Sequence, residues 1–161
     1  MCADGYPSVD LESSDLGEME QEWLLLVRLH CVSFEHNRLD GWERAVSHAE
    51  DRYGSDNGPV IASRVAMVIR AMRAERQGGF GYLSPFCPSC RQRVTQDEWH
   101  LIALMQAGYR GRAREIAEAA ASFARRGDAP VLASAAARFG SSLAAAVGSH
   151  RSWSACSLVR H

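Results

Sequence analysis

Apolar residues recur at helical spacing through most of this chain. From about residue 15 they return every three or four positions, which is the period of one face of an α-helix. The pattern predicts six helices, over residues 15–37, 40–53, 59–76, 95–106, 111–126 and 128–147. No segment alternates apolar and polar residues convincingly, so we expect no strand. The sequence therefore predicts an all-α protein, with about six helices in one bundle-like domain.

Local signals mark the ends of several helices. "TQDE" at residues 95–98 fits a capping box, in which the Thr95 hydroxyl accepts a backbone hydrogen bond and Glu98 reaches back to the cap. Pro59 follows the turn-forming "GSDNGP" and suits the first turn of a helix. Asp128 is placed to cap the last helix. These signals make the helix boundaries more specific than periodicity alone.

Residues 77–94 break the helical pattern. They contain three glycines, two prolines and the segment Cys-Pro-Ser-Cys, so we expect an irregular loop between the third and fourth helices. The predicted organisation is an acidic disordered tail over 1–14, a single zinc-stapled helical domain over 15–147 and a flexible C-terminal tail over 148–161.

The two cysteines of this loop, Cys87 and Cys90, suggest a zinc knuckle, because a two-residue gap lets two thiolates reach one ion. A structural zinc ion takes four Cys or His ligands. The preferred set is Cys31, Cys87, Cys90 and His100. His30 and His36 are substitutes for the third and fourth ligands. Such a zinc ion would tie the first helix to the loop.

The same cysteine pair has other interpretations. "FCPSC" resembles the active-site segment of glutaredoxin-like proteins, which implies thiol redox chemistry, and "PFCPSCRQRVT" resembles one half of a zinc ribbon. No strand is predicted before the pair and no second CxxC follows it, so neither fold is carried over. The alternative function is that of a thiol redox or iron–sulfur sensor using Cys87 and Cys90. Five cysteines without a secretory signal argue against a disulfide framework.

The net charge of −1 conceals an asymmetry along the chain. Residues 1–60 contain 13 Asp or Glu and 4 Arg, whereas residues 61–161 contain 6 Asp or Glu and 14 Arg. All 18 basic residues are arginine, which suits bidentate contacts to phosphate or carboxylate. The candidate contact residues are Arg91, Arg93, Arg110, Arg112 and Arg114. We expect this arginine-rich second half to bind DNA or an acidic protein surface.

Motifs for catalysis are sparse. The sequence has no Ser/His/Asp order, phosphate loop or HExxH pattern, and Asp40, Glu43 and Glu50 are interpreted as surface acids on a helix. An enzyme is therefore not favoured. Trp42 and Trp99 are expected to anchor the core.

The 161 residues suffice for one domain with a substantial core. No uninterrupted apolar run approaches the roughly 20 residues that span a bilayer, and the N-terminus lacks the basic-then-apolar pattern of a secretory signal. We expect a soluble, cytoplasmic protein with no membrane contact. The predicted function is that of a small zinc-binding regulatory protein that acts by binding.

Overall fold

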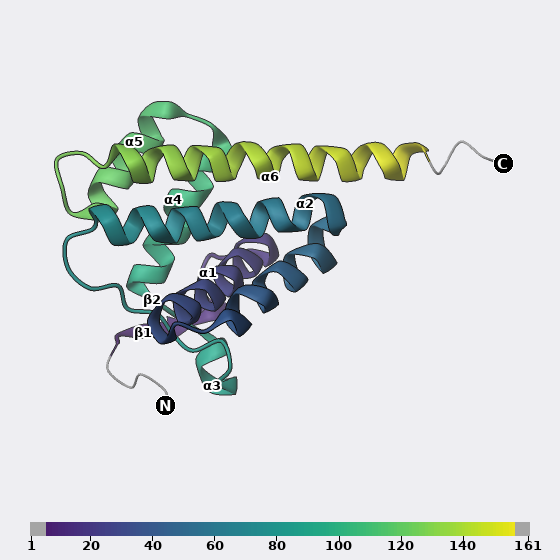
Figure 1. Ribbon diagram of the computed structural model, residues 1–161. Coiled ribbons are helices and arrows are strands. Elements are labelled where there is room, and N and C mark those ends of the chain that lie inside the picture. The colour runs from purple at the N-terminus through teal and green to yellow at the C-terminus, as the bar shows by residue number, and fades with distance from the viewer. Residues whose placement is uncertain (1–5, 157–161) are drawn as a thin grey trace.

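The computed structural model describes residues 6–156, and side chains through residue 148. Its elements are β1 (Ser8–Asp10), the 3-10 helix η1 (Leu11–Ser13), α1 (Glu18–His36), α2 (Leu39–Glu75), α3 (Pro88–Arg91), β2 (Arg93–Thr95), α4 (Gln96–Arg110), α5 (Ala113–Ala124) and α6 (Pro130–Cys156). The helices pack together in one mostly helical domain (Figure 1). The predicted fold class is confirmed, and the short β1–β2 pair adds to it.

Trp23 of α1 is the largest fully buried side chain among the described residues. Its ring meets those of Phe139 and Tyr109 edge to face, with centroids 5.2 Å and 6.1 Å away. One aromatic side chain thereby joins α1 to α4 and α6, and buries a large apolar surface. Trp42 and Trp99, which were predicted to anchor the core, are 49% and 40% exposed. That prediction was wrong, because helical spacing assigns a residue to a face and does not determine how deep the face lies.

Helix α2 breaks at Gly54, where φ is 82° and ψ is 164°. A left-handed φ of this kind carries little steric cost for glycine. The sequence predicted two helices here, joined by a turn over residues 54–59. The structure confines the break to Gly54, and residues 55–58 are already helical. The second half of α2 then runs beside α6 (Figure 1).

Helices α4 and α6 cross with their backbones in contact. A Cβ atom at Gly108 would lie 2.2 Å from the carbonyl oxygen of Ala136, and one at Gly140 would lie 2.0 Å from the carbonyl oxygen of Gly108. Both distances are far inside van der Waals contact, so only glycine fits at the crossing. This crossing sets how closely the two helices pack in the core.

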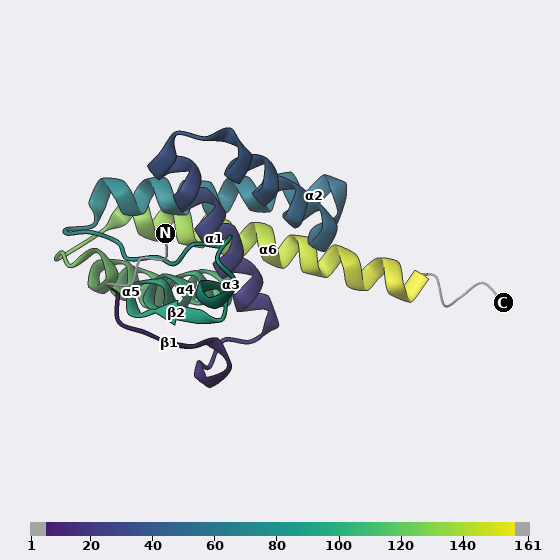
Figure 2. The same cartoon turned by 90° about the horizontal axis from the view of Figure 1, so that it is seen from below.

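Helix α6 is long and apolar enough over Pro130–Gly148 to cross a membrane, by length and composition. In the fold its largest side chains, including Phe139 and Leu143, are buried against α2 and α4, which is how a core helix of a folded domain behaves. The C-terminal end of α6 projects beyond the other helices (Figure 2). At its start, the N–H groups of Val131 and Leu132 donate to the carboxylate of Glu75 at 3.2 Å and 2.8 Å. A residue from α2 therefore caps this helix end, where the sequence predicted Asp128 as the cap.

The N-terminal segment is structured where the sequence predicted a disordered tail. Residues 8–10 pair antiparallel with residues 93–95, with Val9 opposite Val94, and residues 11–13 form η1. At the other end, α6 continues to Cys156, through part of the predicted C-terminal tail. Residues 1–5 and 157–161 of the two predicted tails lie outside the described residues. The β1–β2 pair joins the N-terminal segment to the end of the loop over residues 77–94, which we call the cysteine loop.

Candidate functional site

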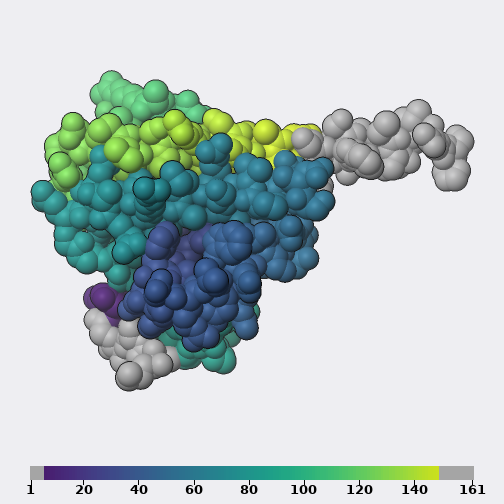
Figure 3. All heavy atoms as spheres, viewed as in Figure 1, coloured from purple at the N-terminus to yellow at the C-terminus, as the bar shows by residue number. Residues whose placement is uncertain are grey.

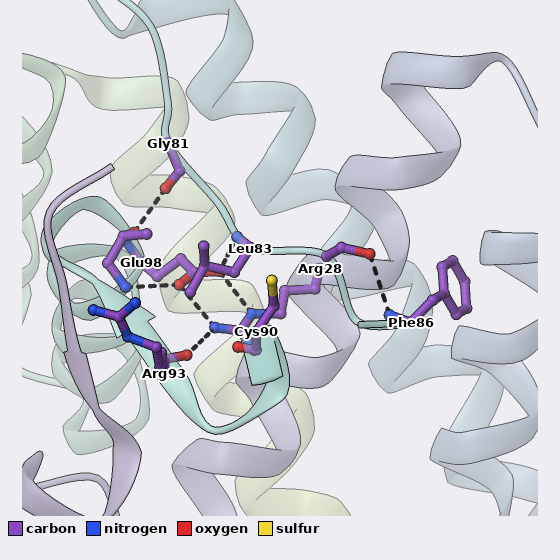
Figure 4. Close-up of polar contacts among 9 residues, drawn as sticks. Arg28, Gly81, Leu83, Phe86, Cys90, Arg93 and Glu98 are labelled. Carbon is purple, nitrogen blue, oxygen red and sulfur yellow. Dashed lines mark hydrogen bonds and ion pairs between the residues drawn. The ribbon is translucent and has the colours of Figure 1, made fainter. Parts of the chain in front are cut away.

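A buried ion pair between α1 and α4 lies directly beneath the cysteine loop (Figure 4). The Nε of Arg28 donates to one carboxylate oxygen of Glu98 at 2.7 Å, and its Nη2 donates to the other at 2.9 Å. The two side chains are 3% and 0% exposed. A bidentate, charge-assisted pair of this kind fixes both position and orientation. Residues 70 positions apart in the sequence are thereby joined.

Arg28 also holds the loop itself. Its Nη2 donates to the carbonyl oxygen of Arg93 at 2.5 Å, and its Nη1 donates to that of Cys90 at 3.4 Å. The Arg93 carbonyl oxygen thereby gains a buried hydrogen-bond partner, and the Cys90 carbonyl oxygen, which also accepts the N–H of Gln92, gains a second one. The sequence predicted that a zinc ion would tie the first helix to this loop. In the structure, the Arg28 guanidinium makes that connection through hydrogen bonds.

Glu98 completes the network from the side of α4. Its carboxylate accepts the N–H of Leu83 at 3.0 Å and that of Thr95 at 2.9 Å, while the Thr95 hydroxyl accepts the N–H of Glu98 at 3.0 Å and donates to the carbonyl oxygen of Gly81 at 2.7 Å. The predicted capping box is confirmed. Besides capping α4, Thr95 and Glu98 bind the backbone of Gly81 and Leu83, where the chain enters the loop.

Sequence reasoning missed Arg28 as a member of this network. The available signal was an arginine within the otherwise mostly apolar run of residues 23–32. A charged residue on a helix face that is buried needs a partner, because an isolated buried charge costs several kcal/mol. The sequence alone did not name the partner, since Glu98 was already assigned to its own helix cap.

Cys87 and Cys90 lie at the two ends of one helical turn. Cys87 is the N-cap of α3, Pro88 is its first residue, and the N–H of Arg91 donates to the carbonyl oxygen of Cys87 at 3.0 Å. The Cys87 Sγ lies 3.2 Å from the Ser89 Oγ. Cys87 is half-buried and Cys90 is buried. The sequence predicted an irregular loop over residues 77–94, so the short helix α3 next to the pair was not expected.

The other predicted zinc ligands are placed differently. Cys31 is a buried thiol on α1, and burial, aided by the charges of Glu98 and Glu35, raises its pKa. His100 is exposed on α4, where its ring packs against that of Trp99. No group of three or more His, Cys, Asp or Glu side chains in the described part of the chain is arranged to hold a metal ion. A zinc ion at Cys31, Cys87, Cys90 and His100 remains a prediction from the sequence.

The two substitute ligands, His30 and His36, both make polar contacts with other residues. The Nε2 of His30 is 2.9 Å from the carbonyl oxygen of Ala62 on α2, and burial lowers the pKa of the ring from 6.5 to about 4. That nitrogen therefore donates as a neutral imidazole and is occupied by the contact. His36 is exposed in the last turn of α1, where its Nε2 is 4.0 Å from a carboxylate oxygen of Glu35.

A groove of about 890 Å³ runs between the N-terminal segment and the start of α4. Its lining includes three of the predicted site residues, Cys90, Arg93 and His100. Trp99 and Asp15 also line it. Arg93 also donates from Nη2 to the carbonyl oxygen of Ser8 at 2.9 Å, which holds β1 over the loop. The fold therefore gathers part of the predicted site, although Cys87 and Cys31 do not line this groove.

The arginines predicted to contact a partner fall into two groups. They are Arg91, Arg93, Arg110, Arg112 and Arg114. The first group, Arg91 and Arg93, precedes α4, and the second begins at Arg110, the last residue of that helix. The 15 residues of α4 place the two groups about 22 Å apart along the helix axis. Arg91 shares a small groove with Asp10 and Glu12. The acidic and basic segments of the chain thus partly meet within the fold.

Two of these arginines are paired on their own helix. Arg112 contacts Glu115 and Arg114 contacts Glu118, each at 2.7 Å, on the exposed surface of α5. Such exposed pairs add little stability, but they reduce the local positive potential that a phosphate or carboxylate would encounter. The α5 arginines are therefore a weaker binding surface than the sequence suggested.

A second basic surface lies between α2 and α6, in a groove of about 660 Å³. Arg64, Arg70 and Arg138 line it, and no Asp or Glu does. Met67 and Val131 provide exposed apolar surface, at 43% and 56% exposure. The sequence pattern did not join Arg64 and Arg70 to Arg138, which lies on a helix more than 60 positions later. We call this the α2–α6 groove.

The chain matches no known family model, and neither the curated proteins nor the solved structures include a significant match.

Proposed function

We propose that this protein is a non-enzymatic binding protein, and that its α2–α6 groove takes an acidic, amphipathic segment of a partner protein. The observation that carries the proposal is the combination of three arginines, exposed apolar side chains and no lining acid in one groove. The proposal keeps one of the two partners predicted from the sequence, an acidic protein surface. It assigns the binding surface to α2 and α6 instead of the arginines near α4 and α5.

The charges of the groove support an acidic ligand. Arg70 and Arg138 make no ion pair with any described residue, and Arg64 is held by a hydrogen bond from its Nε to the Ser142 Oγ at 3.1 Å. Unpaired guanidinium groups can form bidentate contacts with partner carboxylates without first breaking an internal pair. The helices that carry these arginines adjoin on one face of the molecule (Figure 3).

The apolar side chains of the groove favour a protein segment over a nucleic acid. Met67 and Val131 are exposed side chains that line the groove together with the arginines, and contact with leucine- or phenylalanine-like side chains would bury them. A phosphate backbone offers no such apolar surface. Methionine also adapts well to irregular apolar partners. An amphipathic helix with one acidic and one apolar face matches both features of the groove.

The test is a titration of the full chain with a fluorescent synthetic helical peptide that carries glutamate and leucine on opposite faces. We expect saturable binding that weakens as salt rises, and no saturable binding of the matched peptide with glutamine in place of glutamate. A double substitution, Arg70→Gln with Arg138→Gln, should weaken binding at least about tenfold, which corresponds to about 1.4 kcal/mol.

The matched control is Arg112→Gln with Arg114→Gln, which removes the same charge from α5. Affinity of that variant should stay within about twofold of the parent. If both double variants lose affinity equally, binding follows net charge and the groove is not the site. If a random-sequence DNA duplex binds more tightly than the peptide and depends on the same arginines, the partner is nucleic acid and the proposal is wrong.

A further inference from the structure

We infer that Cys87 and Cys90 form a reversible thiol–disulfide site, which exchanges with low-molecular-weight disulfides of the glutathione class. The inference is independent of the α2–α6 groove, because it rests on residues of the α3 turn. It assigns to the structure a modification site whose two sulfurs have different roles.

The two cysteines differ in accessibility. Cys87 is half-buried, whereas Cys90 is 6% exposed. Thiol–disulfide exchange needs one thiolate that can reach a disulfide in solution and a second that can displace the product. Because Cys87 is the more exposed of the two, it is assigned the attack on the incoming disulfide. Cys90 is assigned the second attack, on the mixed disulfide at Cys87. The Ser89 hydroxyl, 3.2 Å from the Cys87 Sγ, can donate a hydrogen bond to a thiolate there.

The backbone holds both cysteines within one short turn. Pro88 fixes the first helical φ, and the bond from Arg91 to the Cys87 carbonyl closes the turn. Arg28 holds the far end through the carbonyl oxygens of Cys90 and Arg93. Because the chain between the sulfurs is short and already ordered, closing the disulfide loses little conformational entropy.

The exchange between the two protein thiols and glutathione disulfide requires no other reactant. The Cys87 thiolate attacks one sulfur of glutathione disulfide, which forms a mixed disulfide and releases one glutathione thiolate. The Cys90 thiolate then attacks the Cys87 sulfur, which forms the Cys87–Cys90 disulfide and releases the second glutathione. The protein pair is oxidised by two electrons, the two glutathiones leave reduced, and the two thiol protons pass to solvent or to the departing thiolates.

Cys31 provides an internal comparison. Its thiol is buried on α1 and its pKa is raised by that burial, so it should be unreactive under the same conditions. It lies on α1, outside the α3 turn. Modification of Cys31 under the same conditions would therefore show that the reagent reacts with cysteines whatever their environment.

The experiment uses the full chain with Cys2→Ser and Cys156→Ser, reduced and treated with a chelator, then incubated with glutathione disulfide and examined by intact mass. The parent should lose two hydrogens and gain no glutathione. Adding Cys90→Ser should trap one glutathione on Cys87, whereas adding Cys87→Ser should give no adduct. The Cys31→Ser version should behave like the parent.

Three results would overturn the inference. The parent could stay reduced in excess glutathione disulfide. The Cys87→Ser version could accept glutathione as fast as the Cys90→Ser version, which would remove the assigned roles. The Cys31→Ser version could lose the reaction, which would place the reactive thiol on α1. Peptide binding by the α2–α6 groove is measured separately, so either proposal can fail while the other stands.

Discussion

Arg28 and Glu98 join α1 to α4 through a bidentate ion pair that is almost completely excluded from solvent. Each partner also binds the cysteine loop, Arg28 through two carbonyl oxygens and Glu98 through two backbone N–H groups. The loop conformation therefore depends on a pair whose members come from two helices. Substitution of either member is therefore expected to disturb the loop as well as the contact between α1 and α4.

Removing one partner of this pair is expected to be costly. Arg28→Met leaves the Glu98 carboxylate buried without its counter-charge and removes two hydrogen bonds to the loop. The free energy of unfolding should fall by about 3–5 kcal/mol, measured by urea denaturation. The double variant with Glu98→Gln should lose less than the sum of the two single variants, because it removes the unpaired charge.

The surface pair Arg112–Glu115 is the matched control. Arg112→Met removes the same kind of charge from an exposed position and should leave the denaturation midpoint unchanged. Equal losses in the Arg28 and Arg112 variants would contradict the importance assigned to the buried pair.

The helix crossing gives a second prediction. Gly140→Ala places a methyl group 2.0 Å from the Gly108 carbonyl oxygen, so α4 and α6 must separate. We expect a loss of at least about 2 kcal/mol in the free energy of unfolding. Gly148→Ala, later on α6 and with no atom within 4 Å of the new Cβ, should leave stability unchanged or raise it by up to about 1 kcal/mol. A thermal melt of the two variants distinguishes a steric effect from a change in helix propensity.

His30 predicts a pH dependence of stability. Burial lowers its folded-state pKa from 6.5 to about 4, so between these values the unfolded chain binds a proton that the folded protein does not. The unfolded state then gains protons as pH falls, and stability is lost from about pH 6.5 downward, by up to about 3 kcal/mol near pH 4. His30→Gln, which can still donate to the Ala62 carbonyl, should flatten this part of the profile.

His36→Gln is the control for that measurement. His36 is exposed at the end of α1, so its replacement should leave the slope between pH 6.5 and pH 4 as in the parent. Urea midpoints at several pH values give both slopes. A profile that His30→Gln does not change would mean that other groups cause the acid sensitivity.

The zinc predicted from the sequence is tested by metal removal. Because polar contacts of Arg28, Glu98 and Thr95 already anchor the loop, chelator treatment should leave the circular dichroism spectrum and the melting temperature unchanged. Elemental analysis before and after treatment reports the metal content. Release of one zinc per chain with loss of the folded signal would instead favour the ligand set Cys31, Cys87, Cys90 and His100, and Cys31→Ser with His100→Ala would then identify its members.

The sequence by itself determined the fold class and most helix ends. Apolar periodicity is a local property, and the capping box at Thr95 joins residues only three positions apart, so both can be recognised without the fold. The proximity of Cys87 and Cys90 is likewise local. The exposure of Trp42 and Trp99 was mispredicted because burial depends on which elements cover a face.

The tertiary structure alone decided which distant groups meet. Arg28 and Glu98 are 70 positions apart, and an arginine within an apolar run does not reveal its partner. Glu75 caps α6 from another helix, and the contact of Gly108 with Gly140 appears only when α4 and α6 cross. The α2–α6 groove combines arginines from two separate helices for the same reason. Such contacts depend on three-dimensional packing, which the residue types at each position permit but do not specify.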